Sequence, residues 1–199
     1  LKLINKWAWQ DNEDSNFYYE IDKLNQKYLA STISLITGID IIEIEKYFNE
    51  LITDELLKET LNKNLTLIPE YGNDIKIAYG RRIGWYALVR ILKPKTIVET
   101  GVSHGVGSCV LASALLRNKE EGFNGRYYGT DISPTAGRLI SEPYKSVSKI
   151  IYGDSIKTLE KINFEIDFFI NDSDHSTDYE LKEYILSLIH ISEPTRQFA

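Results

Sequence analysis

One stretch of the chain reads Thr96-Ile-Val-Glu-Thr-Gly-Val-Ser-His-Gly-Val-Gly-Ser108. It consists of an apolar, β-branched run, an acid and then a glycine loop. A segment of small apolar residues, Cys109–Leu116, follows directly. This order predicts a buried strand, a tight turn and a helix, which is the start of a parallel βαβ unit. Glycine lets the backbone of such a turn approach a ligand closely, and Glu99 ends the strand at the same crevice. A nucleoside-bearing ligand is the natural occupant of that crevice.

Three further segments have the same pattern of an apolar strand that ends in an acid: Arg126–Asp131, Lys149–Asp154 and Ile166–Asp172. The sequence therefore predicts an α/β fold with a doubly wound parallel sheet, a Rossmann-like core. We expect strands near 96–100, 126–131, 149–153 and 166–171, in the spatial order 3-2-1-4. The carboxyl ends of parallel strands share one crevice, so four acids should surround one pocket: Glu99, Asp131, Asp154 and Asp172.

The charge of this pocket favours one class of ligand. Four carboxylates would repel the pyrophosphate of a dinucleotide, whereas they would attract a sulfonium cation and accept hydrogen bonds from a ribose and an adenine amine. The glycine spacing is Gly101-x-x-x-Gly105-x-Gly107, and Asp131 lies 30 residues after Gly101. A dinucleotide fingerprint places its acid about 20 residues on. A nucleotide- or NAD-binding α/β domain that is not a methyltransferase is the alternative.

At these motifs the chain resembles the class I S-adenosylmethionine-dependent methyltransferases, nearest to the small-molecule O-methyltransferase branch. The segment 99–107 matches the first motif of that branch, E-x-G-x-x-x-G-x-G. Asp131 falls at its ribose-binding acid, and Gly153-Asp154-Ser155 at its adenine-contacting acid. The segment 171–176 resembles the D-G-D-H-S signature, with Ser173 in place of the usual glycine. The resemblance covers roughly residues 75–185.

The resemblance implies the cofactor S-adenosylmethionine and methylation of a hydroxyl group on a small metabolite or sugar. It also implies a set of cofactor-binding residues: Glu99, Gly101, Ser103, Gly105, Gly107, Asp131, Ile132, Asp154, Ser155 and Asp172. A methyltransferase-like domain that is catalytically inactive and binds a partner is a further alternative.

A hydroxyl acceptor must lose a proton, which requires a base, a metal or both. The cluster Asp172-Ser173-Asp174-His175 follows the fourth strand and offers three interpretations. Asp172 and Asp174 could hold Mg²⁺ or another divalent cation as a second cofactor. Alternatively, His175 is a metal-free base, with Asp172 as its catalytic partner. In the third interpretation, Asp172 only hydrogen-bonds the loop and His175 caps the next helix.

The composition excludes several classes of partner. The net charge is −6 and no basic block occurs, so we expect no nucleic-acid partner. No apolar run approaches the ~18 residues of a membrane span, and no signal-peptide pattern occurs, which makes the cytoplasm the expected compartment. The single cysteine, Cys109, excludes an internal disulfide framework and should be a buried small residue. We expect a small-molecule substrate, and a homo-oligomer is compatible with these features.

An N-terminal helical extension, residues 1–74, should precede the core at 75–185. Helical patterning runs from about 17 to 35, Asp40 caps a second helix to 51, and Thr53 or Asp54 caps a third to about 62. A connector over 65–73 leads to a fourth helix over 74–92. Gly80 and Gly84 would share one face of this helix, beside two arginines. Of these, Arg82 is preferred over Arg81 to grip a carboxylate of cofactor or substrate.

The last segment, residues 186–199, is expected to be a non-native tail. Residues 186–196 resemble the in-frame translation of a sequencing-library transposon adapter, LSLIHISEPTR. On that interpretation the biological sequence stops near Ile185. The fourth strand would then be left at a sheet edge, and we expect this fragment to be poorly soluble and inactive.

Overall fold

The structure is a computed structural model that describes residues 20–66, 68 and 77–190. Its centre is one four-stranded parallel sheet in the order β3-β2-β1-β4. The strands are β1 (Thr96–Thr100), β2 (Arg126–Asp131), β3 (Ser148–Tyr152) and β4 (Phe168–Asn171). The predicted fold class, strand order and parallel sense are confirmed, with β3 starting one residue early and β4 two residues late.

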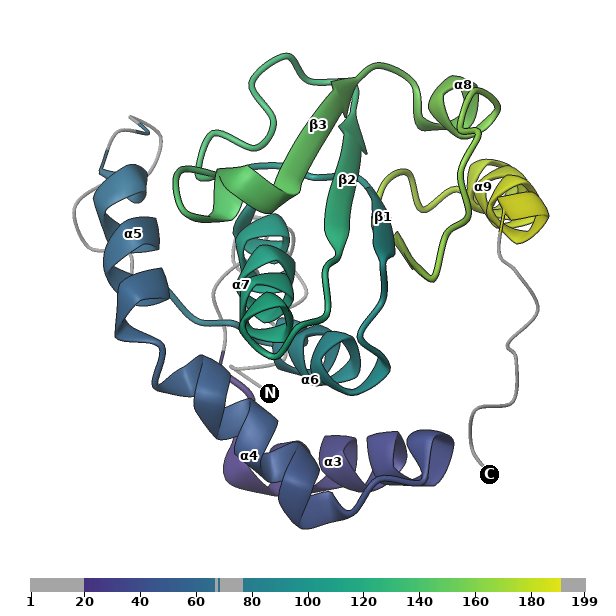
Figure 1. Cartoon of the computed structure of the whole chain (residues 1–199). Coiled ribbons are helices and arrows are strands. Elements are labelled where there is room, and N and C mark those ends of the chain that lie inside the picture. Colours follow the sequence, from purple (N-terminus) through teal and green to yellow (C-terminus); the bar gives the residue numbers. More distant parts are fainter. Residues whose placement is uncertain (1–19, 67, 69–76, 191–199) are drawn as a thin grey trace, which may run out of the picture.

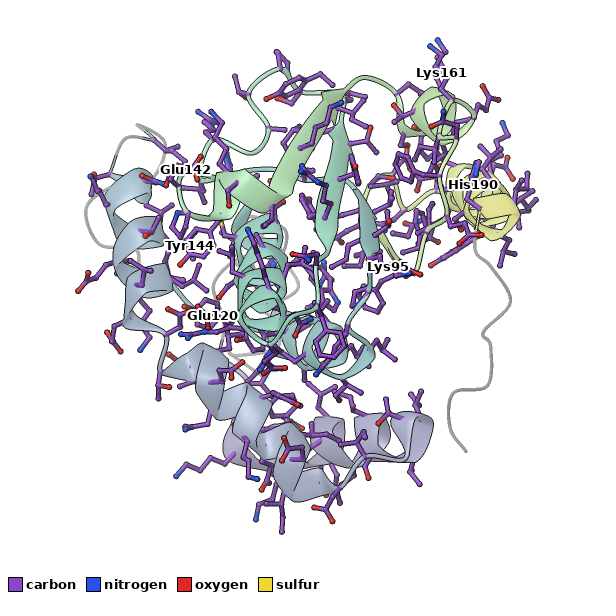
Figure 2. All side chains as sticks on the ribbon, viewed as in Figure 1. Lys95, Glu120, Glu142, Tyr144, Lys161 and His190 are labelled. Carbon is purple, nitrogen blue, oxygen red and sulfur yellow. The ribbon has the colours of Figure 1, made fainter. Side chains whose placement is uncertain are left out.

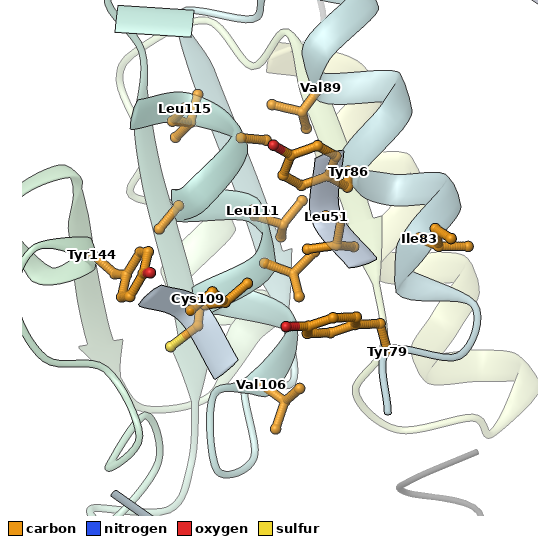
Figure 3. Packing of buried hydrophobic residues seen from close by; sticks show 14 of the residues in the cluster. Leu51, Tyr79, Ile83, Tyr86, Val89, Val106, Cys109, Leu111, Leu115 and Tyr144 are labelled. Atoms are coloured by element: carbon orange, nitrogen blue, oxygen red, sulfur yellow. The ribbon is translucent and has the colours of Figure 1, made fainter. Parts of the chain in front are cut away.

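Alternating side chains of the strands pack on opposite faces of the sheet. Ile97 and Tyr127 belong to the cluster shared with α6 (Arg82–Leu92) and α7 (Val106–Glu120). Their neighbours Val98 and Tyr128 belong to a second cluster with Leu159 of α8 (Ser155–Leu159), beside which α9 (Thr177–His190) also packs. Helices therefore cover both faces and form three layers (Figure 1). Figure 3 shows side chains of α6 and α7 packed against each other in the first cluster.

The helical extension consists of α3 (Lys23–Thr37), α4 (Ile41–Ile52) and α5 (Glu55–Leu65). Aspartates cap all three helices: Asp22, Asp40 and Asp54 each accept a backbone N–H of the first turn. A buried arginine then joins the extension to the core. Arg90 of α6 donates to Glu50 of α4 at 2.7 Å and to Glu121, after α7, at 2.5 Å. The extension is thus packed against α6 and α7 (Figure 1), and the end of α5 reaches the loop after β2, where Asn64 donates to the Leu139 carbonyl at 2.8 Å.

The predicted helix over 74–92 is shorter than expected. It begins at Arg82, and Gly80 lies in the preceding turn with φ +52°, so Gly80 and Gly84 do not share a helical face. A Cβ at Gly84 would lie 3.3 Å from the Leu29 side chain, so the close approach there is made by α3. The first helix similarly begins at Lys23, because Asp22 caps it. Residues 17–19 and most of the connector lie outside the described part of the chain.

The last described helix continues across the boundary that the sequence predicts after Ile185. Ser187 is buried, and the backbone carbonyl of His190 accepts the N–H of Ile166 at 2.8 Å. The His190 ring nitrogen Nε2 lies 3.0 Å from the Leu159 carbonyl, on the side of the molecule where Lys161 also lies (Figure 2). The boundary itself stays a prediction, and residues 191–199 lie outside the description. None of the described helices has the length and apolar character needed to cross a membrane.

Candidate cofactor-binding site

A cleft of about 1010 Å³ opens at the carboxyl edge of the sheet. It combines the ends of all four strands, the glycine loop after β1 and the start of α6. Every site residue predicted from the sequence lines it: Glu99, Gly101, Ser103, Gly105, Gly107, Asp131, Ile132, Asp154, Ser155, Asp172, Asp174 and His175. The topology thus brings together side chains that lie up to 76 residues apart in the sequence.

The loop between β1 and α7 has a conformation that glycine makes possible. Gly101 has φ +82° and Gly105 has φ +97°, and Ser103 between them has φ +51°. A Cβ on Gly101 would lie 2.0 Å from the backbone carbonyl oxygen of Asp172, so the loop touches the chain after β4 directly. A Cβ on Gly107 would lie 3.0 Å from Glu99 Oε1. These glycines let the loop pack closely against the chain after β4 and against Glu99 at the cleft that they line.

The acids after β2 and β3 are held by backbone N–H groups. Asp131 accepts the N–H of Ser103 on Oδ2 and that of Ser133 on Oδ1, both at 2.8 Å. The Asp131 carboxylate therefore links the β2 end to the glycine loop. Asp154 caps α8 by accepting the N–H of Lys157 at 2.9 Å. Both acids line the cleft, and each carboxylate has further lone pairs that can accept hydrogen bonds from a ligand.

Glu99 is the most deeply buried acid of the cleft. It is 2% exposed and accepts the Tyr127 hydroxyl, and the Ser108 hydroxyl at 3.2 Å. Burial raises the pKa of Glu99 from 4.5 to about 7, against the opposing effects of the Tyr127 hydrogen bond and the nearby Arg82 charge. Glu99 is therefore an acid that a cationic ligand would ionise, because a positive charge in the cleft favours the carboxylate.

This raised pKa predicts a pH dependence of stability. Folding favours the protonated form, so the stabilisation is complete below pH 4.5 and is lost as the pH rises to about 7. The full shift corresponds to about 3 kcal/mol. Between pH 4.5 and pH 8 we expect the ligand-free protein to lose more thermal stability than the Glu99→Gln variant, whose amide does not titrate. Parallel melting curves of the two proteins across this range would contradict the assignment.

The cluster after β4 adopts a loop in which its two acids have different partners. Asp172 Oδ1 lies 2.5 Å from Arg81 Nη2 and 4.0 Å from His175 Nε2. Asp174 accepts the N–H of Ser176 at 2.7 Å, which lowers the pKa of Asp174. His175 is 60% exposed, and its Nδ1 lies 3.7 Å from the Glu180 carboxylate. His175 thus stands at the mouth of the cleft between two carboxylates.

The metal interpretation depends on Asp172 and Asp174, two carboxylates that would hold Mg²⁺ together with water molecules. Within residues 20–66, 68 and 77–190, no group of three or more His, Cys, Asp and Glu side chains is placed to hold a metal ion. Asp172 and Asp174 stay the predicted pair, but the first is ion-paired with Arg81 and the second is turned to the backbone. We therefore assign no step of the chemistry to a metal.

Several side chains of the site were not identified from the sequence. The ion pair between Arg81 and Asp172 was not predicted, and the guanidinium groups of Arg81 and Arg82 both lie within 6 Å of the Trp85 ring centre. The preference for Arg82 as the partner of a ligand carboxylate stays a prediction. Tyr127 was assigned only to a strand, although its hydroxyl binds Glu99. Tyr179 of α9 also lines the cleft. The only signal for Tyr179 in the sequence is its position shortly after the 171–176 motif.

Comparison with known proteins agrees with this geometry. Residues 98–195 match the family model described as a methyltransferase domain. None of the curated proteins compared with the chain matches it. The fold is similar to that of an O-methyltransferase from Bacillus cereus solved with S-adenosylhomocysteine (SAH), with 18% identity, a TM-score of 0.51, and coverage of 70% of this chain and 63% of that one. A SAH-bound methyltransferase from Podospora anserina gives 22% identity, a TM-score of 0.52, and coverage of 69% and 58%.

Residues 98–195 therefore match a methyltransferase domain, and the fold of the chain is similar to that of two solved methyltransferases, in agreement with the predicted resemblance. The chain spans less than two thirds of the length of these two solved enzymes.

Proposed function

We propose that this protein binds S-adenosylmethionine in the cleft and transfers its methyl group to a hydroxyl of a small metabolite or sugar. The observation that carries the proposal is the convergence of four strand-end acids around a glycine-rich loop. A cation with a ribose and an adenine suits such a cleft, because the acids attract the charge and accept hydrogen bonds from the neutral groups. The glycines of the loop after β1 would let the backbone approach the ligand closely.

Each acid has a distinct role in this proposal. Asp131 accepts the ribose hydroxyls, and its bonds to the glycine loop hold it in place. Asp154 and Ser155 contact the adenine. Glu99, at the centre of the sheet, faces the positively charged part of the cofactor, whose approach would favour its ionised form. The bound cofactor supplies an electrophilic methyl group, so the protein has to align the acceptor and exclude water.

The acceptor hydroxyl must release a proton, and we propose that His175 takes it, with Asp172 stabilising the protonated ring. The 4.0 Å separation of His175 Nε2 and Asp172 Oδ1 supports this pairing. Arg81 Nη2 also lies 2.5 Å from Asp172 Oδ1, so the carboxylate faces both side chains. Transfer then forms an O–C bond, breaks the S–C bond and leaves the proton on the imidazole.

His175→Ala tests the base. We expect the rate of methyl transfer to fall about 100-fold or more, since a positioned base typically contributes about 10²–10⁴-fold. SAH affinity should change by less than about twofold, because the ring lies at the exposed mouth. Single-turnover rates and calorimetry on the same preparations measure both. An unchanged rate would show that His175 is not the base and has only a structural role in the loop.

Calorimetric titration with SAH and, separately, with NAD tests the proposed cofactor. We expect binding of SAH and none of NAD. Binding of NAD alone would support the dinucleotide alternative. Incubation with labelled S-adenosylmethionine and a panel of hydroxylated metabolites then tests turnover. SAH binding without transfer to any acceptor would favour the alternative of an inactive, partner-binding domain.

A further inference from the structure

We propose that Glu183, on α9, is a positioning residue of the cleft. Its carboxylate ties the carboxyl ends of β1 and β4 to the first residue of α8. It thereby sets the positions of Ser155 and of the turn at 171–173. The proposal rests on the proposed function, because these segments belong to the site that we assign to the cofactor.

The Glu183 carboxylate is completely buried and is surrounded by donors from three segments of the chain. Asn171 Nδ2 donates to Oε2 at 2.7 Å, and Thr100 Oγ1 donates to the same oxygen at 3.2 Å. The Ser173 hydroxyl lies 2.8 Å from both carboxylate oxygens. The Ser155 hydroxyl donates to Oε1. One side chain therefore connects the ends of two strands with the N-terminus of a helix.

These contacts place Glu183 directly behind the wall of the cleft. Ser155 and Ser173 both line the cleft, and both bind Glu183 through their hydroxyl groups. Tyr179, one turn earlier on α9, lies 2.9 Å from Ser155 Oγ and donates to Asp154 Oδ2 at 3.2 Å. The same face of α9 thus contacts both members of the Asp154–Ser155 pair. The serine at 173, where the related motif has glycine, gains a function as a donor to Glu183.

The chemistry of these contacts argues for a role beyond packing. A buried carboxylate is costly unless it is hydrogen-bonded. Within the described part of the chain, the donors to Glu183 are neutral hydroxyl and amide groups rather than a cationic side chain. A carboxylate can accept about four hydrogen bonds, and this one uses that capacity to fix several separate segments. Networks of this kind hold the groups that touch a ligand in their binding geometry.

Calorimetry with SAH and with 5′-methylthioadenosine, which has the adenosine but not the amino-acid part, tests the proposal on the 199-residue chain. We expect Glu183→Ala to weaken both ligands by the same factor, about tenfold to 100-fold, because the adenosine side of the cleft is displaced. Glu183→Gln keeps one acceptor oxygen and should restore most of the affinity. Ser173→Ala, which removes one donor and leaves the carboxylate, should weaken binding about fivefold.

Glu50→Gln is the matched control, because Glu50 is another hydrogen-bonded glutamate that joins two helices, away from the cleft. It should lower the melting temperature and leave both dissociation constants unchanged. A purely structural role would give Glu183→Ala the same behaviour, with a lower melting temperature and parental affinity, and would overturn the proposal. If Glu183→Ala does not fold, parental affinity of Ser173→Ala for both ligands would overturn it. Failure of the parent itself to bind SAH would instead refute the proposed function, and this inference with it.

Discussion

The Gly101→Val variant is expected to lose measurable affinity for SAH. Gly101 has φ +82°, and a Cβ there would lie 2.0 Å from the Asp172 carbonyl oxygen and 2.7 Å from Ser173 Cα. The left-handed conformation alone costs about 1–2 kcal/mol for a residue with a Cβ. Overpacking typically adds about 1–3 kcal/mol, and here the obstacle is backbone that cannot rotate away. The loop must move, and it carries the Ser103 N–H that holds Asp131.

The Gly122→Val variant is a control that has the backbone strain of a left-handed conformation without the steric clash expected at Gly101. Gly122 has φ +92°, and nothing lies within 4 Å of a Cβ built there. This control should lose stability through the left-handed conformation and keep full affinity for SAH. Calorimetry and melting of both variants give the comparison. If Gly101→Val bound SAH as tightly as the parent, the ligand would not occupy the cleft at the glycine loop.

Replacing Asp131 with alanine is expected to weaken SAH binding by at least about 100-fold. In the proposed complex the carboxylate accepts two ribose hydroxyls, and each hydrogen bond to a charged group contributes about 1.5–3 kcal/mol. The same substitution frees the N–H groups of Ser103 and Ser133, so the glycine loop also loses an anchor. Both consequences act in the same direction, because the loop and the carboxylate contact one ligand.

The matched control for this substitution is Asp167→Ala. Asp167 accepts the backbone N–H groups of Lys95 and Thr96 at 2.9 and 2.8 Å, at the amino end of β1. It therefore has the same kind of anchoring role as Asp131 at the opposite edge of the sheet. We expect a similar loss of melting temperature with parental affinity. Equal affinities of Asp131→Ala and the parent would place the ribose elsewhere.

The Gly101 and Asp131 variants, the Glu183 variants and the titration of Glu99 each report on a different part of the site. The Gly101 and Asp131 variants probe residues that would touch the cofactor, whereas the Glu183 variants probe a residue behind them. The pH dependence assigned to Glu99 needs no ligand at all, since it depends on burial. Agreement among the three would define the cleft as one cofactor site before any acceptor is known.

Local chemistry determined the sheet and the acids that surround the cleft. β-Branched runs favour strands, and parallel strands with right-handed crossovers allow few arrangements, so the order β3-β2-β1-β4 follows from the pattern. The acids end those strands, and the topology brings all of them to one edge. The cap Asp40 was identified, and Asp54 was one of two candidates with Thr53, because capping depends on residues only two or three positions apart.

Only the tertiary structure decided which side chains meet across the cleft. Arg81 and Asp172 lie 91 residues apart, and nothing in the sequence predicts that these two side chains form an ion pair. The direction in which each arginine points depends on where α6 begins, and the turn at Gly80 rather than helical periodicity sets that point. Glu183 looks in the sequence like one more charged residue of an amphipathic helix. It is a buried acceptor because the ends of β1, β4 and α8 converge on it, and periodicity along one helix carries no information about what the other segments place opposite it.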